Sequence, residues 1–375
     1  MEFDPEAVVW QDRGGAWLET GTRRLQVPSL WPALEAALDG AGPNAWAVGF
    51  CSYEWAPFLE PLVAVPPGEA PVPLAWWGVM ASNDSGRRLQ PPRGPWGALR
   101  LNGCSLADET FRLRVAQIRE AIAAGSVYQV NLTRRWQADG ELDPPALFAH
   151  LAGGTMPRYA AYLSDGHQGW AVLCLSPELL LARRGRRLET RPIKGTRRKF
   201  PGPGGPARAH AELAASPKDA AELAMIVDLE RNDLHRVCLP GSVRAHHPAS
   251  TLMAGEVVHR EAVVAGELMP GVGWLEILRS VFPGGSVTGA PKLAACRVIA
   301  DLEPVPRGVY CGLLGVVRAS GDGVLSLPIR TGVAAGGFLS FHAGGGIVWD
   351  SDPVAEEQES RDKVAGWLRL VGEAP

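Results

Sequence analysis

The 375-residue sequence lacks any apolar run that approaches the roughly 20 residues of a membrane-spanning helix. Its first residues, MEFDPEAVVWQDRGG, carry acids where a secretory signal peptide needs a basic start and an apolar stretch. With a formal net charge of -3, the chain also lacks the excess of Lys and Arg that attracts nucleic acid or anionic membranes. We therefore expect a cytoplasmic protein that binds neither nucleic acid nor membrane and holds any anionic ligand through local groups.

Cysteine is scarce and scattered. None of the 6 cysteines forms the CxxC pair that is typical of a zinc site or a redox dithiol; they are Cys51, Cys104, Cys174, Cys238, Cys296 and Cys311. We expect reduced, mostly buried thiols.

The residues that are present are those of a folded protein, because 46% are hydrophobic and 21% are charged. Proline and glycine punctuate residues 1–100, as in PLVAVPPGEAPVP, and this pattern predicts short strands and loops packed against a larger body. The chain shows no internal repeat, so one continuous unit is expected.

Capping residues and apolar periodicity predict helices further along the chain. One begins at Ser105 and Asp108, which resemble a capping box, and ends at Gly125. Another begins after Ser216, with Pro217 in its first position. Further helices are predicted over residues 273–282, 292–302 and 353–371.

Strands are predicted over residues 127–136, in a pair over residues 176–196, and in a hairpin over residues 324–348 with a GlyGly tip. Residues 200–206, FPGPGGP, are predicted to be a loop. Because the strands come in adjacent pairs, the pattern favours an α+β fold with antiparallel sheets over a doubly wound parallel sheet.

Two predicted helices carry acids three residues apart, so each pair projects from one face. The first pair is Asp219 and Glu222; the second is Glu356 and Glu359, with Lys363 on the same face. Four carboxylates could share a magnesium ion, which prefers oxygen ligands. Spacing alone favours the alternative, solvated helix faces with internal ion pairs.

Two glycine-rich runs, PGGSVTGAP and AGGGIV, could present backbone amides to an anion. The first is not a phosphate-binding Walker loop, because Ala290 and Pro291 follow Gly289 where that motif needs Lys and then Ser or Thr. Tight turns are the plain alternative for both runs.

Several long runs together resemble the chorismate-utilising enzyme family from about Asp108 to Lys363. They include VYQVNL, SPELL, PIKGT, KDAAELAMIVDLERNDL, PGGSVTGAPK and AGGGIVWDSDPVAEEQESRDK. The resemblance implies two stacked antiparallel β-sheets with helices outside. It also implies that residues 1–100 form an N-terminal region integrated into the fold and residues 101–375 a chorismate-binding catalytic region.

The resemblance assigns roles at the reacting centre. Glu178 in SPELL matches the family's general acid. Lys194 in PIKGT matches a lysine that adds to C2 of chorismate in members that aminate C4, whereas members that form anthranilate usually read PIAGT. Gln129 stands where water-adding members generally place a basic lysine. His259 aligns with a histidine facing the substrate ring, and a structural histidine is the alternative.

The same resemblance implies the rest of the site. Magnesium would be bound directly by Glu222 and Glu359, with Asp219 and Glu356 in support and Lys363 beside the substrate carboxylate. In the strand predicted before the second glycine run, Leu325, Leu327 and Ile329 alternate with Ser326, Pro328 and Arg330, so the arginine is expected to point away from the apolar face. It is either a carboxylate clamp or a surface arginine. The remaining implied pocket residues are Thr288, Gly289, Ala290, Lys292, Tyr310, Gly344, Gly345 and Gly346; for Tyr310 a core role is the alternative.

The implied reaction converts chorismate and ammonia to 4-amino-4-deoxychorismate, for p-aminobenzoate and folate biosynthesis. None of the cysteines lies in a GxCxG turn of a fused glutaminase, so a separate glutaminase subunit is expected to supply the ammonia. The alternatives are anthranilate formation and a catalytically silent chorismate-binding subunit.

Overall fold

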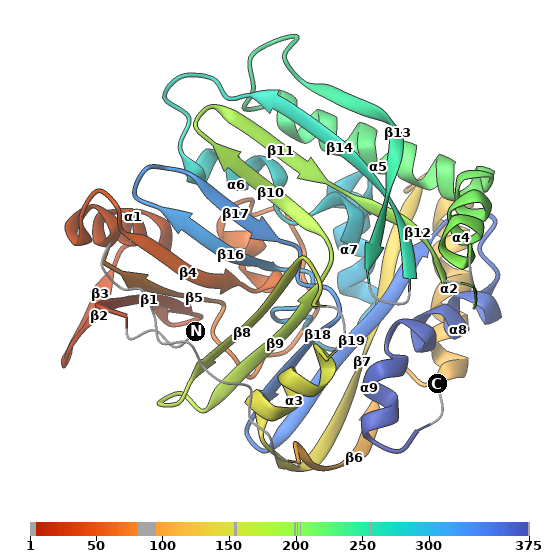
Figure 1. The fold of residues 1–375 in the computed structure, drawn as a ribbon, viewed down its shortest axis with the longest axis horizontal. Coiled ribbons are helices and arrows are strands. Elements are labelled where there is room, and N and C mark those ends of the chain that lie inside the picture. The colour runs from red at the N-terminus through yellow and green to blue at the C-terminus, as the bar shows by residue number, and fades with distance from the viewer. Residues whose placement is uncertain are drawn as a thin grey trace.

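Two antiparallel β-sheets form the body of the molecule (Figure 1). The computed structural model describes residues 5–81, 95–153, 156–198, 200, 202, 204–254 and 257–373. The 12-stranded sheet contains β1 (Ala7–Asp12), β2 (Gly15–Thr20), β3 (Arg23–Val27), β4 (Trp46–Cys51), β5 (Ala75–Met80), β10 (Leu179–Arg184), β11 (Arg187–Arg191), β12 (Ile193–Arg198), β13 (Arg244–Ala254), β14 (Val257–Glu267), β16 (Leu313–Arg318) and β17 (Gly323–Ser326). The 7-stranded sheet contains β6 (Gly97–Cys104), β7 (Gln129–Leu142), β8 (Tyr159–Asp165), β9 (Trp170–Ser176), β15 (Gly289–Ala290), β18 (Thr331–Ala335) and β19 (Phe338–Ile347).

Helices cover the outer faces of both sheets, which confirms the α+β class with helices outside. Helix α1 packs on β5 and β1, α4 and α5 on β12 and β14, α7 on β7, and α8 on β19. The helices are α1 (Leu30–Ala41), α2 (Asp108–Ala123), α3 (Pro144–Leu151), α4 (Gly205–Ala214), α5 (Pro217–His235), α6 (Trp274–Val281), α7 (Lys292–Leu302), α8 (Pro353–Lys363) and α9 (Ala365–Leu370), with short 3-10 turns η1 (Tyr53–Phe58) and η2 (Gly285–Val287). Within the described ranges, no helix is long and apolar enough to cross a membrane.

The two sheets stack through an aromatic contact. Trp76 and Phe50, from the larger sheet, meet Trp170 of β9 edge to face, with ring centroids 5.5 and 5.4 Å apart. Edge-to-face packing suits the opposite charge of ring faces and edges and adds to the burial of apolar area. This buried cluster fixes the sheet carrying Lys194 over the sheet carrying Gln129.

The N-terminal strands continue the larger sheet, because β4 pairs with β16 from Cys51 opposite Leu313 to Trp46 opposite Arg318. Behind them Trp31 packs against Trp77 and Trp274, with ring centroids 5.5 and 6.3 Å apart. The short strands predicted for this region are confirmed in its described part. The region also contains helix α1, which the sequence pattern does not predict.

Most predicted helices are confirmed, with corrections at their ends. Ser216 caps α5 by accepting a bond from the Asp219 amide at 3.3 Å. Helix α2 begins at Asp108, because the Ser105 hydroxyl accepts the Arg135 amide of β7 instead of capping the helix. The predicted last helix is two, α8 and α9, which meet at Val364.

The predicted loop over residues 200–206 is only partly a loop. Helix α4 begins at Gly205 with Pro206 in its first turn, where a proline is tolerated because the first amides have no helical partner. Pro201 and Pro203 of that run lie outside the described residues.

The alternating strand predicted through Arg330 is wrong. Strand β17 ends at Ser326, and the chain then crosses from the larger sheet to β18 of the smaller one. Pro328 has no amide to donate to a ladder, and Arg330 has a φ of 51°, so strand geometry does not set the direction of its side chain. The hairpin tip is confirmed at Gly336 and Gly337, both with positive φ.

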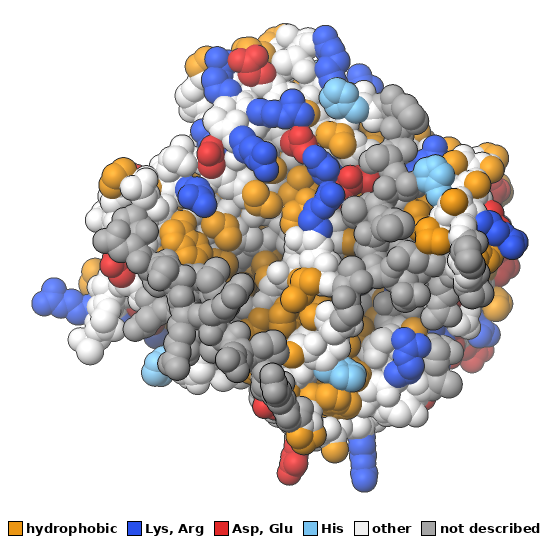
Figure 2. Space-filling model, in the orientation of Figure 1, with side chains coloured by type: hydrophobic (Ala, Val, Ile, Leu, Met, Phe, Trp, Pro, Cys, Tyr) orange, Lys and Arg blue, Asp and Glu red, His pale blue; other side chains and the backbone are white. Residues whose placement is uncertain are grey.

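On the face shown in Figure 2, Lys and Arg side chains gather over the region of strands β10, β11 and β14, with Asp and Glu side chains between them. Arg187 and Arg191 both pair with Glu189, and Arg186 pairs with Glu267. The positive charges of these arginines are therefore balanced by neighbouring acids.

The six cysteines are free thiols, and all but Cys104 are buried, as expected.

Candidate active site

Lys194 of β12 lies where the two sheets meet. Its Nζ donates to the backbone oxygen of Ser286 at 3.1 Å and lies 3.5 Å from the point that a Cβ on Gly346 would occupy. Burial lowers the pKa of this ammonium, and Lys363 adds to the effect, whereas Glu222, Glu178 and Glu359 oppose it. A lysine with a lowered pKa holds more of its amine in the neutral, nucleophilic form.

Glu178, just before β10, is a buried carboxyl with 4% of its surface exposed. Ser286 Oγ donates to its Oε1 at 2.6 Å. Burial raises the pKa of Glu178 to about 7, outweighing the Ser286 bond and the charge of Lys194, which both lower it. A carboxyl with such a pKa can hold and release a proton near neutrality.

Ser286 joins these two groups, and sequence reasoning does not single it out. Its hydroxyl holds Glu178 while its carbonyl holds Lys194. The residue belongs to η2, inside the glycine-rich run that was assigned to anion binding through its amides. No spacing signal marks a residue whose carbonyl contacts β12 and whose hydroxyl contacts a glutamic acid just before β10.

Gln129 lies at the start of β7 and has no exposed surface. Neither its amide oxygen nor its amide nitrogen has a hydrogen-bond partner among the described residues. A Cβ on Gly346 would lie 2.3 Å from Gln129 Nε2, so the glycine leaves room for this amide and for Lys194. A buried amide without partners costs folding free energy, which suits a group held for a ligand.

The glycine run of β19 also faces α8. A Cβ on Gly345 would lie 3.1 Å from Glu356 Oε2, 3.7 Å from Glu359 Oε1 and 3.6 Å from Lys363 Nζ. Lys363 pairs with Glu359 at 2.7 Å and donates to the Gly344 carbonyl at 2.8 Å. Glu356, Glu359 and Lys363 therefore all lie close to the backbone of Gly345.

On α5, Glu222 is half-buried and close enough to Lys194 to raise its pKa. The carboxylate of Asp219 instead pairs with Arg197 at 2.6 Å. Among the described residues, no three His, Cys, Asp or Glu side chains form a ready-made metal cluster. The donor set still fits magnesium, because the oxygens of Glu356 and Glu359 cradle Gly345 and a magnesium ion takes few protein ligands and keeps waters or substrate oxygens.

His259 and Arg330 form a second polar pair, with Arg330 Nη2 3.1 Å from His259 Nε2. Burial, Arg330 and Lys363 lower the pKa of His259 to about 3, so the ring is neutral and its Nε2 accepts from the guanidinium. Arg330 also lies near enough to Glu178 for that acid to raise its pKa, which burial lowers.

Some of the remaining predicted residues lie at the site, and others have their contacts elsewhere. Gly289 and Ala290 pair with Val130 and Gln129 of β7, which brings their backbone to the site. The Thr288 hydroxyl donates to the Gly284 carbonyl at 2.9 Å. The described contacts of two others lie elsewhere: the ammonium of Lys292 pairs with Asp233 at 2.7 Å, and the ring of Tyr310 stacks on His342 at 5.1 Å.

A buried glutamic acid whose pKa is raised to about 7, a half-buried lysine, and the acids of α8 beside the glycine backbone of β19 together form a candidate enzyme site in an α+β fold. The chorismate binding enzyme family matches residues 3–369, and the chain therefore belongs to this family. The anthranilate synthase component 1 of Streptomyces coelicolor is 43% identical over 270 residues, covering 72% of this chain and 53% of the relative. The aminodeoxychorismate synthase component 1 of Klebsiella aerogenes is 40% identical over 274 residues, covering 69% of this chain and 57% of the relative.

Among solved structures, anthranilate synthase component I from Streptococcus pneumoniae shares the fold, with a TM-score of 0.82 and 22% identity over 97% of this chain and 90% of that one. This likeness concerns the fold alone. The chain spans about half the length of the curated relatives that it matches.

Proposed function

We propose that this protein aminates chorismate at C4 to give 4-amino-4-deoxychorismate, using ammonia from a separate glutaminase. The observation that carries the proposal is the pairing of Lys194 with Glu178 through Ser286. An alanine at position 194, usual in the related anthranilate-forming enzymes, could not supply an amine there.

In the proposed reaction, Lys194 Nζ forms a bond to C2 of chorismate as the ring double bonds shift and the C4–O bond breaks. Glu178 donates its proton, so the hydroxyl leaves as water. Ammonia then bonds to C4, the double bonds shift back, and the Nζ–C2 bond breaks. The electrons of that bond return to Nζ, which frees Lys194 as a neutral amine, and the surplus proton of the new C4 ammonium passes to the carboxylate of Glu178.

The electrostatic surroundings support the proposed roles of Glu178 and Lys194. The pKa of Glu178, raised to about 7, leaves a proton available, and the lowered pKa of Lys194 favours the neutral amine. Arg330 and Lys363 provide the cations for an anionic substrate, and Gln129 offers an unpaired amide where a basic residue would be needed to activate water.

Magnesium would be held by Glu222 and Glu359, with Glu356 and Asp219 in support. When bound, it would neutralise a substrate carboxylate that otherwise faces these acids. Lys363 pairs with Glu359 at 2.7 Å. With magnesium bound to Glu359, this lysine would instead pair with the substrate carboxylate.

Anthranilate formation is the second candidate, because a relative at 43% identity is an anthranilate synthase component 1. Product analysis separates the two. The purified protein would be incubated with chorismate, magnesium and excess ammonium, with and without an aminodeoxychorismate lyase, and the products identified by mass spectrometry.

We expect an aminated product that retains its pyruvyl group and becomes p-aminobenzoate only with the lyase. Anthranilate would assign the second candidate, and isochorismate or salicylate would mean that water is the nucleophile. Unchanged chorismate would contradict the proposed amination, because the excess ammonium replaces the ammonia that the glutaminase would supply.

A further inference from the structure

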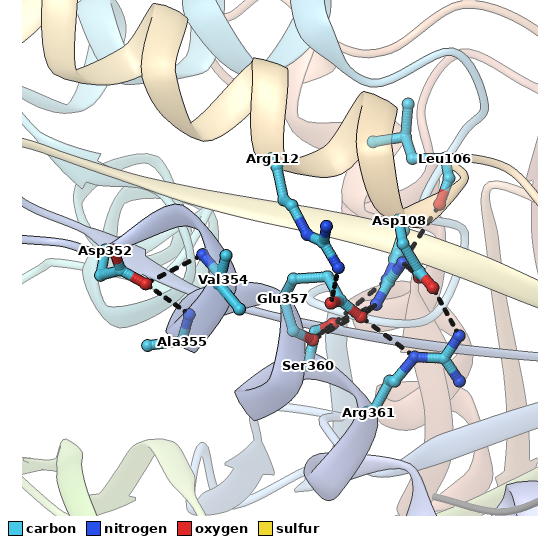
Figure 3. Close-up of polar contacts among 10 residues, drawn as sticks. Leu106, Asp108, Arg112, Asp352, Val354, Ala355, Glu357, Ser360 and Arg361 are labelled. Carbon is cyan, nitrogen blue, oxygen red and sulfur yellow. Dashed lines mark hydrogen bonds and ion pairs between the residues drawn. The ribbon is translucent and has the colours of Figure 1, made fainter.

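Helix α8 carries Glu356, Glu359 and Lys363 on one face, and a separate polar cluster holds its neighbouring face. Glu357 and Ser360 stand one residue further along than Glu356 and Glu359, which rotates them by about 100° around the helix axis. The face formed by Glu357, Ser360 and Arg361 turns toward the start of α2, where Figure 3 shows it with Asp108 and Arg112.

Arg134 of β7 lies at the centre of this cluster and is 1% exposed. Its Nη2 donates to Glu357 Oε1 at 3.1 Å and to Ser360 Oγ at 2.8 Å, and its Nη1 donates to Asp108 Oδ1 at 2.6 Å. The planar guanidinium thus reaches α8 and α2 at once, as a flexible ammonium could not.

The surroundings leave the guanidinium little freedom. Phe111 and Trp136 have ring centroids 4.8 Å from its central carbon, an arrangement that favours a cation. Arg112 and Arg361 complete the cluster, donating to Glu357 at 3.0 Å each, and Arg361 also pairs with Asp108 at 2.8 Å. Two acids are therefore shared by three arginines.

Folding stability alone is a weak reason for such a cluster, because buried ion pairs can often be replaced by apolar groups without loss. What the cluster does determine is the rotation and depth of α8 relative to β7, the strand that also carries Gln129. The start of α8 is fixed separately, since Asp352 accepts the amides of Val354 and Ala355 at 3.0 and 2.9 Å (Figure 3).

We propose that Arg134 is a positioning residue, which acts through Glu357 and Ser360 to aim the acid face of α8 at the substrate and its magnesium ion. This inference rests on the proposed function for its catalytic consequence. Its structural consequence, the ordering of α8, can be measured without substrate.

The test compares Arg134→Met with the wild type and with Arg114→Met, a matched change at an α2 arginine that donates to Gln117 on its own helix. Hydrogen–deuterium exchange is measured first, without magnesium or substrate. We expect amides of α8 to exchange about tenfold faster or more in Arg134→Met, with β19 and α5 unchanged. Arg114→Met should match the wild type.

The kinetic readout is the concentration of magnesium at half-maximal rate, together with KM for chorismate and kcat. In Arg134→Met we expect the half-maximal magnesium concentration and KM for chorismate each to rise about tenfold. We expect kcat to fall less, since saturating magnesium and chorismate can return α8 to its wild-type orientation. Arg134→Lys keeps the positive charge but loses the planar guanidinium with its several donors. Its half-maximal magnesium concentration and KM should therefore stay raised.

Unchanged α8 exchange, full recovery in Arg134→Lys, or equal loss of protection across α8, β19 and α5 would overturn the inference. If Arg134→Met does not fold, Ser360→Ala decides, because it removes only the hydroxyl that Arg134 Nε and Nη2 share, at 3.1 and 2.8 Å. A wild type that aminates nothing would refute the proposed function but leave the exchange test intact.

Discussion

Replacing Ser286 with alanine should move the pH dependence of the reaction without removing either proposed catalytic group. The hydroxyl donates to Glu178 Oε1 at 2.6 Å, and such a bond to a carboxylate favours the charged form. A hydrogen bond to a charged group is worth about 1.5–3 kcal/mol and one pKa unit about 1.4 kcal/mol. The pKa of Glu178, raised to about 7 by burial, should therefore rise by a further one to two units, roughly.

The sign of the effect follows from the role of Glu178 as an acid. Activity requires its protonated form and falls as pH rises through its pKa, so the alkaline limb of kcat/KM should move to higher pH in Ser286→Ala. The contact of Lys194 with the backbone oxygen of residue 286 survives the change.

The assay is the rate of amination between pH 5 and 10 at low chorismate, with Ser286→Thr as the variant that keeps a hydroxyl. We expect Ser286→Thr to keep the wild-type limb. An alkaline limb in Ser286→Ala that stays in place, or moves to lower pH, would refute the assignment of Glu178 as the acid held by Ser286.

Three further changes test the packing around the site. Gly346→Ala places a Cβ 2.3 Å from Gln129 Nε2, and isothermal titration should show chorismate affinity falling about tenfold or more. Gln129→Leu removes a buried amide without partners, so thermal unfolding should show stability unchanged or raised by about 1–2 kcal/mol while chorismate binding weakens; a large destabilisation would contradict this. Arg307→Met leaves the buried Glu303 carboxylate without its ion pair at 2.7 Å, and urea unfolding should show a loss of about 3–5 kcal/mol, whereas a loss near zero would count against the pair.

Local signals in the sequence predict elements where the chain uses them locally. Ser216 and Pro217 mark the start of α5, and the GlyGly pair marks the hairpin tip, because capping and tight turns involve near neighbours. Ser105 misleads because its hydroxyl does not bond locally: it accepts the Arg135 amide of β7, about thirty residues away along the chain. Arg330 misleads because the chain changes sheets beside it.

The residues of the site also divide into those that the sequence identifies and those that only the structure identifies. Glu178, Lys194, Glu222 and Glu359 are found through the resemblance to a family, and the structure adds the burial and neighbours that shift the pKa values of Glu178 and Lys194. Ser286 and Arg134 act through partners on distant segments, so neither spacing nor periodicity marks them. Their roles depend on which strands and helices meet, and a single sequence does not contain that information in readable form.

The proposed amination depends most directly on the amine of Lys194, which adds to C2 of chorismate before ammonia bonds to C4. Lys194→Met keeps most of the side chain's bulk and removes only that amine. At saturating chorismate, magnesium and ammonium, we expect this variant to form 4-amino-4-deoxychorismate at least a thousandfold more slowly, roughly, than the wild type while binding chorismate with similar affinity. Formation of the aminated product at the wild-type rate would contradict the claim.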